Sequence, residues 1–141
     1  MSTAKRLDNQ MAGLAYQILQ PGFTLEVRTR MRQLPARLRG GGLAATYAFI
    51  LSHSGQANAV EKAYTRLAEV IARYVAEHRL IPDGPEQMDP YLFLEQLSKS
   101  KMTPTTYTRI SLRVEALAGW MSRLSDALEP QSDQGGDRGQ E

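Results

Sequence analysis

The stretch VEKAYTRLAEVIARYVAEH (60–78) carries the clearest structural signal in the sequence. Its core-type positions recur every three or four residues and fall within about 100° of arc on a helical projection. These positions are Val60, Tyr64, Leu67, Ile71, Tyr74, Val75 and His78. On the remaining arc, Glu61, Glu69 and Glu77 alternate with basic residues, which is typical of a solvated helix face. The stretch therefore predicts a long amphipathic helix with one buried face.

The same spacing predicts three helices before this stretch. The first has its apolar stripe on Leu7, Met11, Leu14 and Ile18 and ends at Pro21-Gly22. The second covers residues 23–39, and Pro35 should either kink it or open a new turn because proline lacks a backbone donor. Glycines 40–42 are expected to end that helix, and residues 43–51 form the next one, which fades near residues 53–55.

Two helices are predicted after the break at residues 82–85. Asp89-Pro90 and Thr103-Pro104 each combine an N-cap residue with proline at the first helical position. The second of these starts a long apolar stripe on Tyr107, Ile110, Val114, Leu117, Met121, Leu124 and Leu128, with Trp120 beside it. Period-two alternation, the mark of a half-buried strand, is absent. The fold class expected is all-α, a single-domain bundle of about six helices with short loops.

The net charge of +2 is unevenly distributed along the 141 residues. Residues 129–141 contain four carboxylates and one arginine, which leaves a charge of +5 on residues 1–128. We expect residues 1–128 to form the helical domain and residues 129–141 to be a disordered acidic tail, because the tail has no apolar side chain. The chain has no cysteine and no apolar run near the roughly 20 residues that cross a bilayer. A cytoplasmic location without a membrane partner is therefore expected.

Five arginines occur within VRTRMRQLPARLR (27–39) without an intervening carboxylate. If this segment is helical, its apolar stripe is Val27, Met31, Leu34 and Leu38. Arg28, Arg32 and Arg39 lie on one side of that stripe, and Arg30 and Arg37 lie on the other. Guanidinium groups suit phosphate, so the pattern favours a module that grips a nucleic-acid backbone, although arginines on a helix are more often an ordinary solvated surface.

Catalytic chemistry is not expected from this sequence. His78 lies on an apolar stripe, where a core or boundary histidine is commoner than a catalytic one, and His53 lies at a helix end. Paired-histidine metal motifs and the phosphate-loop spacing of glycines are absent, so no metal and no cofactor is predicted. A small hydrolase would need Ser52, His53 or the carboxylates of residues 61–77.

Two binding alternatives remain open from the residues alone. One is a free-standing DNA-binding regulator that uses residues 23–54 as a helix-turn-helix, although LAATYAFILSHS (43–54) has no arginine, lysine, asparagine or glutamine for base edges. The other is a protein-protein adaptor whose basic helix docks on an acidic partner. Tyr47, Tyr64, Tyr74 and Tyr107 are expected in the core rather than on nucleic-acid bases, whereas Tyr91 lies off the apolar stripes.

Two blocks of sequence resemble the small all-helical subunit of the type III-B CRISPR effector, the Cmr complex. The first is LPARLRGGGLAATYAFILSHSG (34–55), which has that family's elements as Leu34-Pro35, Leu38-Arg39, Gly42-Leu43 and Ala48-Phe49. The second is YTRISLRVEALAGWMSRLSDAL (107–128), with Trp120, Arg123 and Leu124 in the family's order. The chain departs from the pattern at Gly41, where a polar residue, often asparagine, precedes the glycine-leucine pair. The resemblance covers roughly residues 5–128.

The resemblance implies a non-catalytic subunit that is present in several copies. It implies three kinds of partner: the other Cmr effector subunits, the guide and target RNA, and neighbouring copies of the chain, stacked beside the guide RNA. Guide–target pairing would read the sequence, so this subunit should contact phosphates without base selectivity. The candidate nucleic-acid-binding residues are Arg28, Arg32, Arg37 and Arg39, followed by Lys5, Arg6, Lys99 and Lys101.

Overall fold

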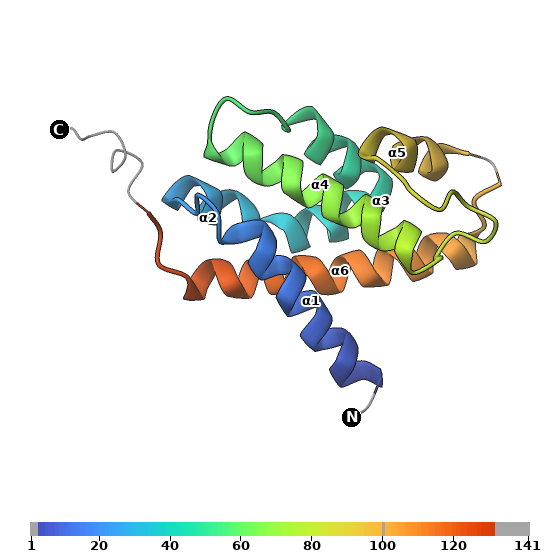
Figure 1. Ribbon diagram of the computed structural model, residues 1–141, viewed down its shortest axis with the longest axis horizontal. Coiled ribbons are helices and arrows are strands. Elements are labelled where there is room, and N and C mark those ends of the chain that lie inside the picture. Colours follow the sequence, from blue (N-terminus) through green and yellow to red (C-terminus); the bar gives the residue numbers. More distant parts are fainter. Residues whose placement is uncertain (1–2, 100, 132–141) are drawn as a thin grey trace.

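Six α-helices and no β-strand make up the regular structure of residues 3–99 and 101–131, the part of the chain that the computed structural model describes (Figure 1). They are α1 (Thr3–Leu19), α2 (Leu25–Met31), α3 (Leu34–Ser52), α4 (Ala59–Glu77), α5 (Pro90–Ser98) and α6 (Pro104–Ala127). The all-α bundle of about six helices predicted from the sequence is confirmed.

The long helices α4 and α6 organise the core. α6 packs against α1, α2 and α3, while α4 packs against α1, α2, α3 and α5. α1 crosses α6, and its N-terminal end projects beyond the bundle (Figure 1). The predicted apolar stripe of residues 60–75 is buried along α4. Tyr47 of α3 meets the ring of Phe93 of α5 edge to face at 4.8 Å and donates a hydrogen bond of 2.7 Å to the Ala68 carbonyl oxygen of α4. Burial raises the pKa of Tyr47 well above its ordinary value.

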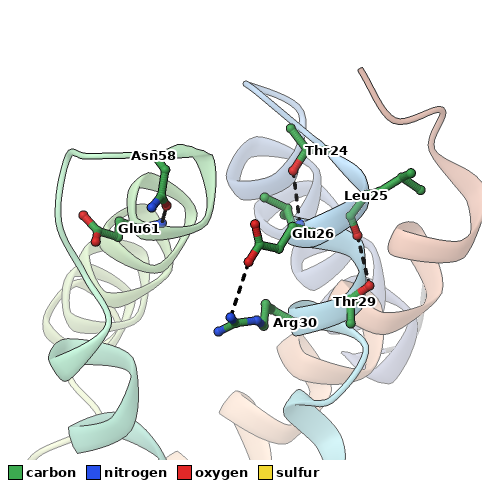
Figure 2. Close-up of polar contacts among 8 residues, drawn as sticks. Thr24, Leu25, Glu26, Thr29, Arg30, Asn58 and Glu61 are labelled. Carbon is green, nitrogen blue, oxygen red and sulfur yellow. Dashed lines mark hydrogen bonds and ion pairs between the residues drawn. The ribbon is translucent and has the colours of Figure 1, made fainter. Parts of the chain in front are cut away.

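Short polar side chains begin four of the helices. The predicted caps Asp89 and Thr103 are confirmed, since their side chains accept hydrogen bonds from the backbone N–H groups of Leu92 and Thr106. Thr24 caps α2 and Asn58 caps α4 in the same way (Figure 2). Each cap satisfies a helix N–H group that has no partner within its own helix.

The expected single helix over residues 23–39 is wrong. α2 ends at Met31, and α3 begins at Leu34 with Pro35 in its first turn, so the proline opens a new helix instead of kinking an existing one. The buried stripe nevertheless survives the break, because Val27, Met31 and Leu34 are all in the core together with Leu38.

The glycine run interrupts the helix as expected, and the interruption lies at its last residue. Gly40 and Gly41 continue α3, and only Gly42 leaves helical geometry, with φ 85° and ψ 175°. That conformation is essentially restricted to glycine. α3 is therefore kinked at Gly42, and the segment that follows carries Tyr47 and Ile50 into the core.

The chain returns to α2 after α6. The Gln131 N–H donates a hydrogen bond of 2.6 Å to the Phe23 carbonyl oxygen, just before α2 begins. Residues 129–131 of the predicted acidic tail thus lie beside α2, and the rest of that tail, residues 132–141, lies outside the described residues.

Candidate nucleic-acid interface

One row of arginines on the α2–α3 segment faces the C-terminal end of α6. Arg28 Nε donates to the Ser125 carbonyl oxygen at 2.9 Å, and its Nη2 donates to the Leu128 carbonyl oxygen at 3.0 Å. Arg32 forms an ion pair of 2.6 Å with Asp126, and more than half of each side chain is exposed, 53% and 56%. Arg28 therefore supplies partners to carbonyl groups that α6 cannot satisfy itself, and its positive charge suits the negative end of the helix dipole.

The other row, Arg30 and Arg37, lies toward α4. Arg30 forms an ion pair with Glu26 at 3.4 Å and points from α2 into the space on the α4 side (Figure 2). The Arg37 guanidinium lies over the ring of Phe49, 3.7 Å from its centroid. Burial raises the pKa of Tyr64 on α4, while a hydrogen bond from Arg30 and the charges of Arg30 and Arg37 oppose that rise. The charges of the two guanidinium groups thus favour the ionised form of Tyr64.

The remaining candidate residues lie in separate parts of the molecule. Arg39 is exposed on α3, and Lys5 and Arg6 are exposed in the first turns of α1. Lys99 and Lys101 lie at the α5–α6 turn, at the opposite end of the bundle from α2 (Figure 1). They line a cavity of about 540 Å³ together with Asp83, Gln96 and Thr103. The fold brings Arg28 and Arg32 together at the end of α6, but it does not gather the eight candidates into one surface.

Sequence reasoning missed three cations with defined contacts. Arg66 donates hydrogen bonds of 2.8 Å to the carbonyl oxygens of Ile18 and Pro21, so it closes the end of α1 as Arg28 closes the end of α6; burial lowers its pKa. Arg113 donates to the Tyr74 hydroxyl at 2.6 Å, and Arg123 lies 4.7 Å from the Trp120 ring centroid. No sequence signal marks these contacts, because their partners depend on how the helices pack.

Both histidine rings take part in contacts within the fold. His53 lies against Phe49, with its Nδ1 2.9 Å from the Phe49 carbonyl oxygen. His78 is exposed at the end of α4, where it stacks on Tyr74 and approaches the Gln10 side chain at 3.2 Å. Among the described residues, no group of three or more histidine, aspartate or glutamate side chains is placed to hold a metal ion. No described helix is long and apolar enough to cross a membrane.

Comparison with known proteins identifies the family. The family model described as CRISPR-associated protein (Cas_Cmr5) matches residues 9–128. A search of curated proteins gave no match to the chain. The matched range contains all of α2 to α6 and most of α1, so the match covers the whole bundle and not an isolated motif. The chain therefore belongs to the Cmr5 family of CRISPR-associated proteins, the small subunits of type III-B CRISPR complexes.

Proposed function

We propose that this chain is a non-catalytic subunit that lines the RNA groove of a type III-B RNA-guided effector complex. Several copies stack beside the subunits that carry the guide RNA, and each copy contacts the RNA backbone through basic side chains. The observation that carries the proposal is the family match over residues 9–128. The charge of +5 on residues 1–128 supports it, because a basic surface favours a polyanion.

Three of the eight candidate cations are open to a ligand. Arg6, Arg39 and Lys101 are exposed and have no hydrogen bond or ion pair within the described residues. Lys99 is held only by Glu95 of its own helix, at 3.8 Å, in the kind of exposed pair that contributes little. Phosphate contacts from Arg39 on α3 and from the Lys99–Lys101 turn would use two separate segments of one subunit, which suits a protein that contacts an extended strand at several points.

The histidine contacts support a binding role without catalysis. The His53 imidazole is engaged with the Phe49 carbonyl group, and that of His78 with Tyr74 and Gln10, so both rings have positions that the fold explains. We therefore assign RNA cleavage to another subunit and expect no cofactor. Antiviral defence in the cytoplasm is the setting that this role implies.

Purification of the tagged chain from its native cells tests the proposal. Nuclease-treated and untreated lysates are compared, and the bound proteins and nucleic acids are identified. We expect the other effector subunits together with short guide RNAs, and more than one copy of this chain per complex by native mass spectrometry. Recovery of the chain alone, or with duplex DNA fragments, would favour the regulator instead and would contradict the proposal.

A further inference from the structure

The cavity of about 540 Å³ lies where the loop after α4 meets the turn that joins α5 to α6, at the end of the bundle where α6 begins (Figure 1). Two hydrogen-bonded turns form part of its wall. The Gly84 N–H donates to the Ile81 carbonyl oxygen at 2.9 Å, and the Met102 N–H donates to the Lys99 carbonyl oxygen at 3.1 Å. Small-ligand sites have volumes of about 300–1,000 Å³, so this cavity is large enough for one small ligand.

The first turn presents a carboxylate to the cavity. Asp83 lines the cavity and has a left-handed backbone, with φ 59°. Aspartate adopts this region more readily than most residues, and Pro82 before it suits the second position of such a turn. The Asp83 carboxylate has no hydrogen bond or ion pair with any residue that the structure describes. It is therefore a free hydrogen-bond acceptor at a position that the turn defines.

The second turn presents two ammonium groups to the same cavity. Lys99 is paired only with Glu95, at 3.8 Å, and 63% of the Glu95 side chain is exposed, so solvent weakens this attraction. Lys101 makes no hydrogen bond or ion pair in the described part of the chain. The two lysines outweigh the single carboxylate of Asp83, which leaves a charge of +1 on the lining side chains. This balance favours an anionic ligand that also carries a hydrogen-bond donor.

A nearly buried hydroxyl group gives independent support for a ligand. Thr106 lines the cavity from the first turn of α6 and is only 5% exposed. Its backbone N–H donates to the Thr103 hydroxyl oxygen at 3.1 Å, but its own hydroxyl forms no hydrogen bond with the described residues. A hydroxyl on a nearly buried side chain costs free energy when it has no partner, and a polar group of a ligand in the cavity would supply one.

We propose that this cavity binds one ribonucleotide of a single-stranded RNA. The phosphate lies between Lys99 and Lys101, and the ribose 2′-hydroxyl donates a hydrogen bond to the Asp83 carboxylate. The Thr106 hydroxyl donates to an oxygen of the same nucleotide. The base has apolar surface available on four lining residues: Ile81, Pro82, Pro85 and Met102. The inference rests on the proposed function, and it adds a group that recognises ribose to the contacts with phosphate.

The first test compares RNA and DNA. Labelled single-stranded RNA and DNA oligomers of one sequence are titrated with the full chain, and binding is followed by fluorescence anisotropy. We expect the RNA to bind roughly tenfold more tightly, because only RNA offers the 2′-hydroxyl to the carboxylate. Asp83→Gly should remove this preference while the turn is kept, since glycine tolerates φ 59°. Glu86→Gln removes the same charge outside the cavity and should leave the preference intact.

The second test concerns the phosphate contact. Lys99→Gln with Lys101→Gln should weaken the binding of RNA and DNA alike and reduce the log–log salt slope by about 0.7, the value for one phosphate of a single strand. Arg73→Gln with Arg79→Gln removes the same charge from exposed positions outside the cavity. This control should keep the slope of the unmodified chain. An equal loss in the two double variants would show a general effect of charge and would overturn the site.

A third set of variants keeps the inference falsifiable if Asp83→Gly unfolds. Thr106→Val removes the hydroxyl but keeps the shape, and its backbone N–H remains capped by Thr103. We expect it to lower the RNA affinity several-fold without lowering the melting temperature measured by circular dichroism, whereas Thr106→Ser should retain the affinity. Equal RNA affinities of these two variants would overturn the site.

The remaining outcomes separate this site from the proposed function. Equal affinities of the unmodified chain for RNA and DNA, or no binding of RNA by the full chain, overturn the site. If the chain prefers RNA through this cavity but is recovered from its cells without the effector subunits, the proposed function fails and the site stands. If it is recovered with those subunits while the cavity variants bind RNA normally, the site alone fails.

Discussion

The two rows of arginines on the α2–α3 segment face different neighbours. Arg28 and Arg32 meet the end of α6, where backbone carbonyl groups and Asp126 receive their donors. Arg37 lies over the Phe49 ring of α3, and its buried Nε has no hydrogen-bond partner within the described residues, while Arg30 pairs with Glu26 of its own helix. The difference teaches that arginines a few residues apart on one segment can have unlike surroundings, a helix end for one pair and aromatic or same-helix side chains for the other, so each can be tested separately.

Substitution of Gly42, the kink residue between Arg37 and Phe49, should have the largest effect on stability. Gly42→Ala is expected to lower the free energy of unfolding by about 2–3 kcal/mol, because a side chain is strained at φ 85° and ψ 175°. Urea denaturation followed by circular dichroism measures the change. Gly41→Ala is the control; its position is helical, with only the Ala45 Cβ in ordinary contact at 3.6 Å, so stability should rise by about 0.5–1 kcal/mol. Equal effects of the two substitutions would show that the kink is not needed.

The next largest effect on stability is expected at Arg28 and Arg32, which contact the end of α6. Arg28→Ala is expected to cost about 2 kcal/mol, since two charge-assisted hydrogen bonds to α6 carbonyl groups are lost. Arg32→Ala removes an exposed ion pair and should cost less than about 1 kcal/mol in the same denaturation experiment. A larger loss of stability in Arg32→Ala than in Arg28→Ala would show that the ion pair with Asp126 stabilises the fold more than the two Arg28 hydrogen bonds do.

The buried Tyr64 hydroxyl predicts an alkaline effect on stability. Burial raises the pKa of Tyr64 above its ordinary value of 10.0, so the folded chain keeps this proton at a pH where the unfolded chain loses it. The stabilisation is complete below pH 10 and is lost as the pH rises above it, at up to about 1.4 kcal/mol per pH unit for one tyrosine. Denaturation midpoints between pH 9 and 11 should therefore fall less steeply in Tyr64→Phe.

The same pH series tests the influence of the arginines on this hydroxyl. Arg30→Gln removes a group that opposes the pKa rise of Tyr64, so the folded state should hold its proton more tightly and the alkaline fall in stability should steepen. An unchanged slope in this variant would mean that Arg30 does not act on the Tyr64 hydroxyl.

The smallest effect on stability is expected at Ser125, whose backbone carbonyl oxygen accepts a hydrogen bond from Arg28. Its side chain is fully buried, and its hydroxyl has no hydrogen-bond partner within the described residues. Ser125→Ala should therefore leave stability unchanged or raise it by roughly 0.5 kcal/mol, and it should not disturb the Arg28 contact, which uses the backbone carbonyl of the same residue. Destabilisation of more than about 1 kcal/mol would reveal a partner for the hydroxyl.

The sequence was sufficient to predict α1, α4, α5 and α6 and two of the helix caps, because apolar spacing and N-cap residues act over a few neighbours, whereas the boundary between α2 and α3 was missed. The separation of Arg30 and Arg37 from Arg28 and Arg32 also followed from helical spacing alone, and it survived a break in the helix. The contacts of the arginines could not be predicted in this way. Arg28 meets a carbonyl group 97 residues further along the chain, and Arg66 meets one 48 residues earlier, so their partners exist only after the helices pack.

The kink at Gly42 bears on how this part of the sequence can drift during evolution. Gly40 and Gly41 are helical and have room for a side chain, so substitutions there do not destabilise the fold and selection for stability does not remove them. A mutation at Gly42 meets a backbone that only glycine adopts easily, and it is removed.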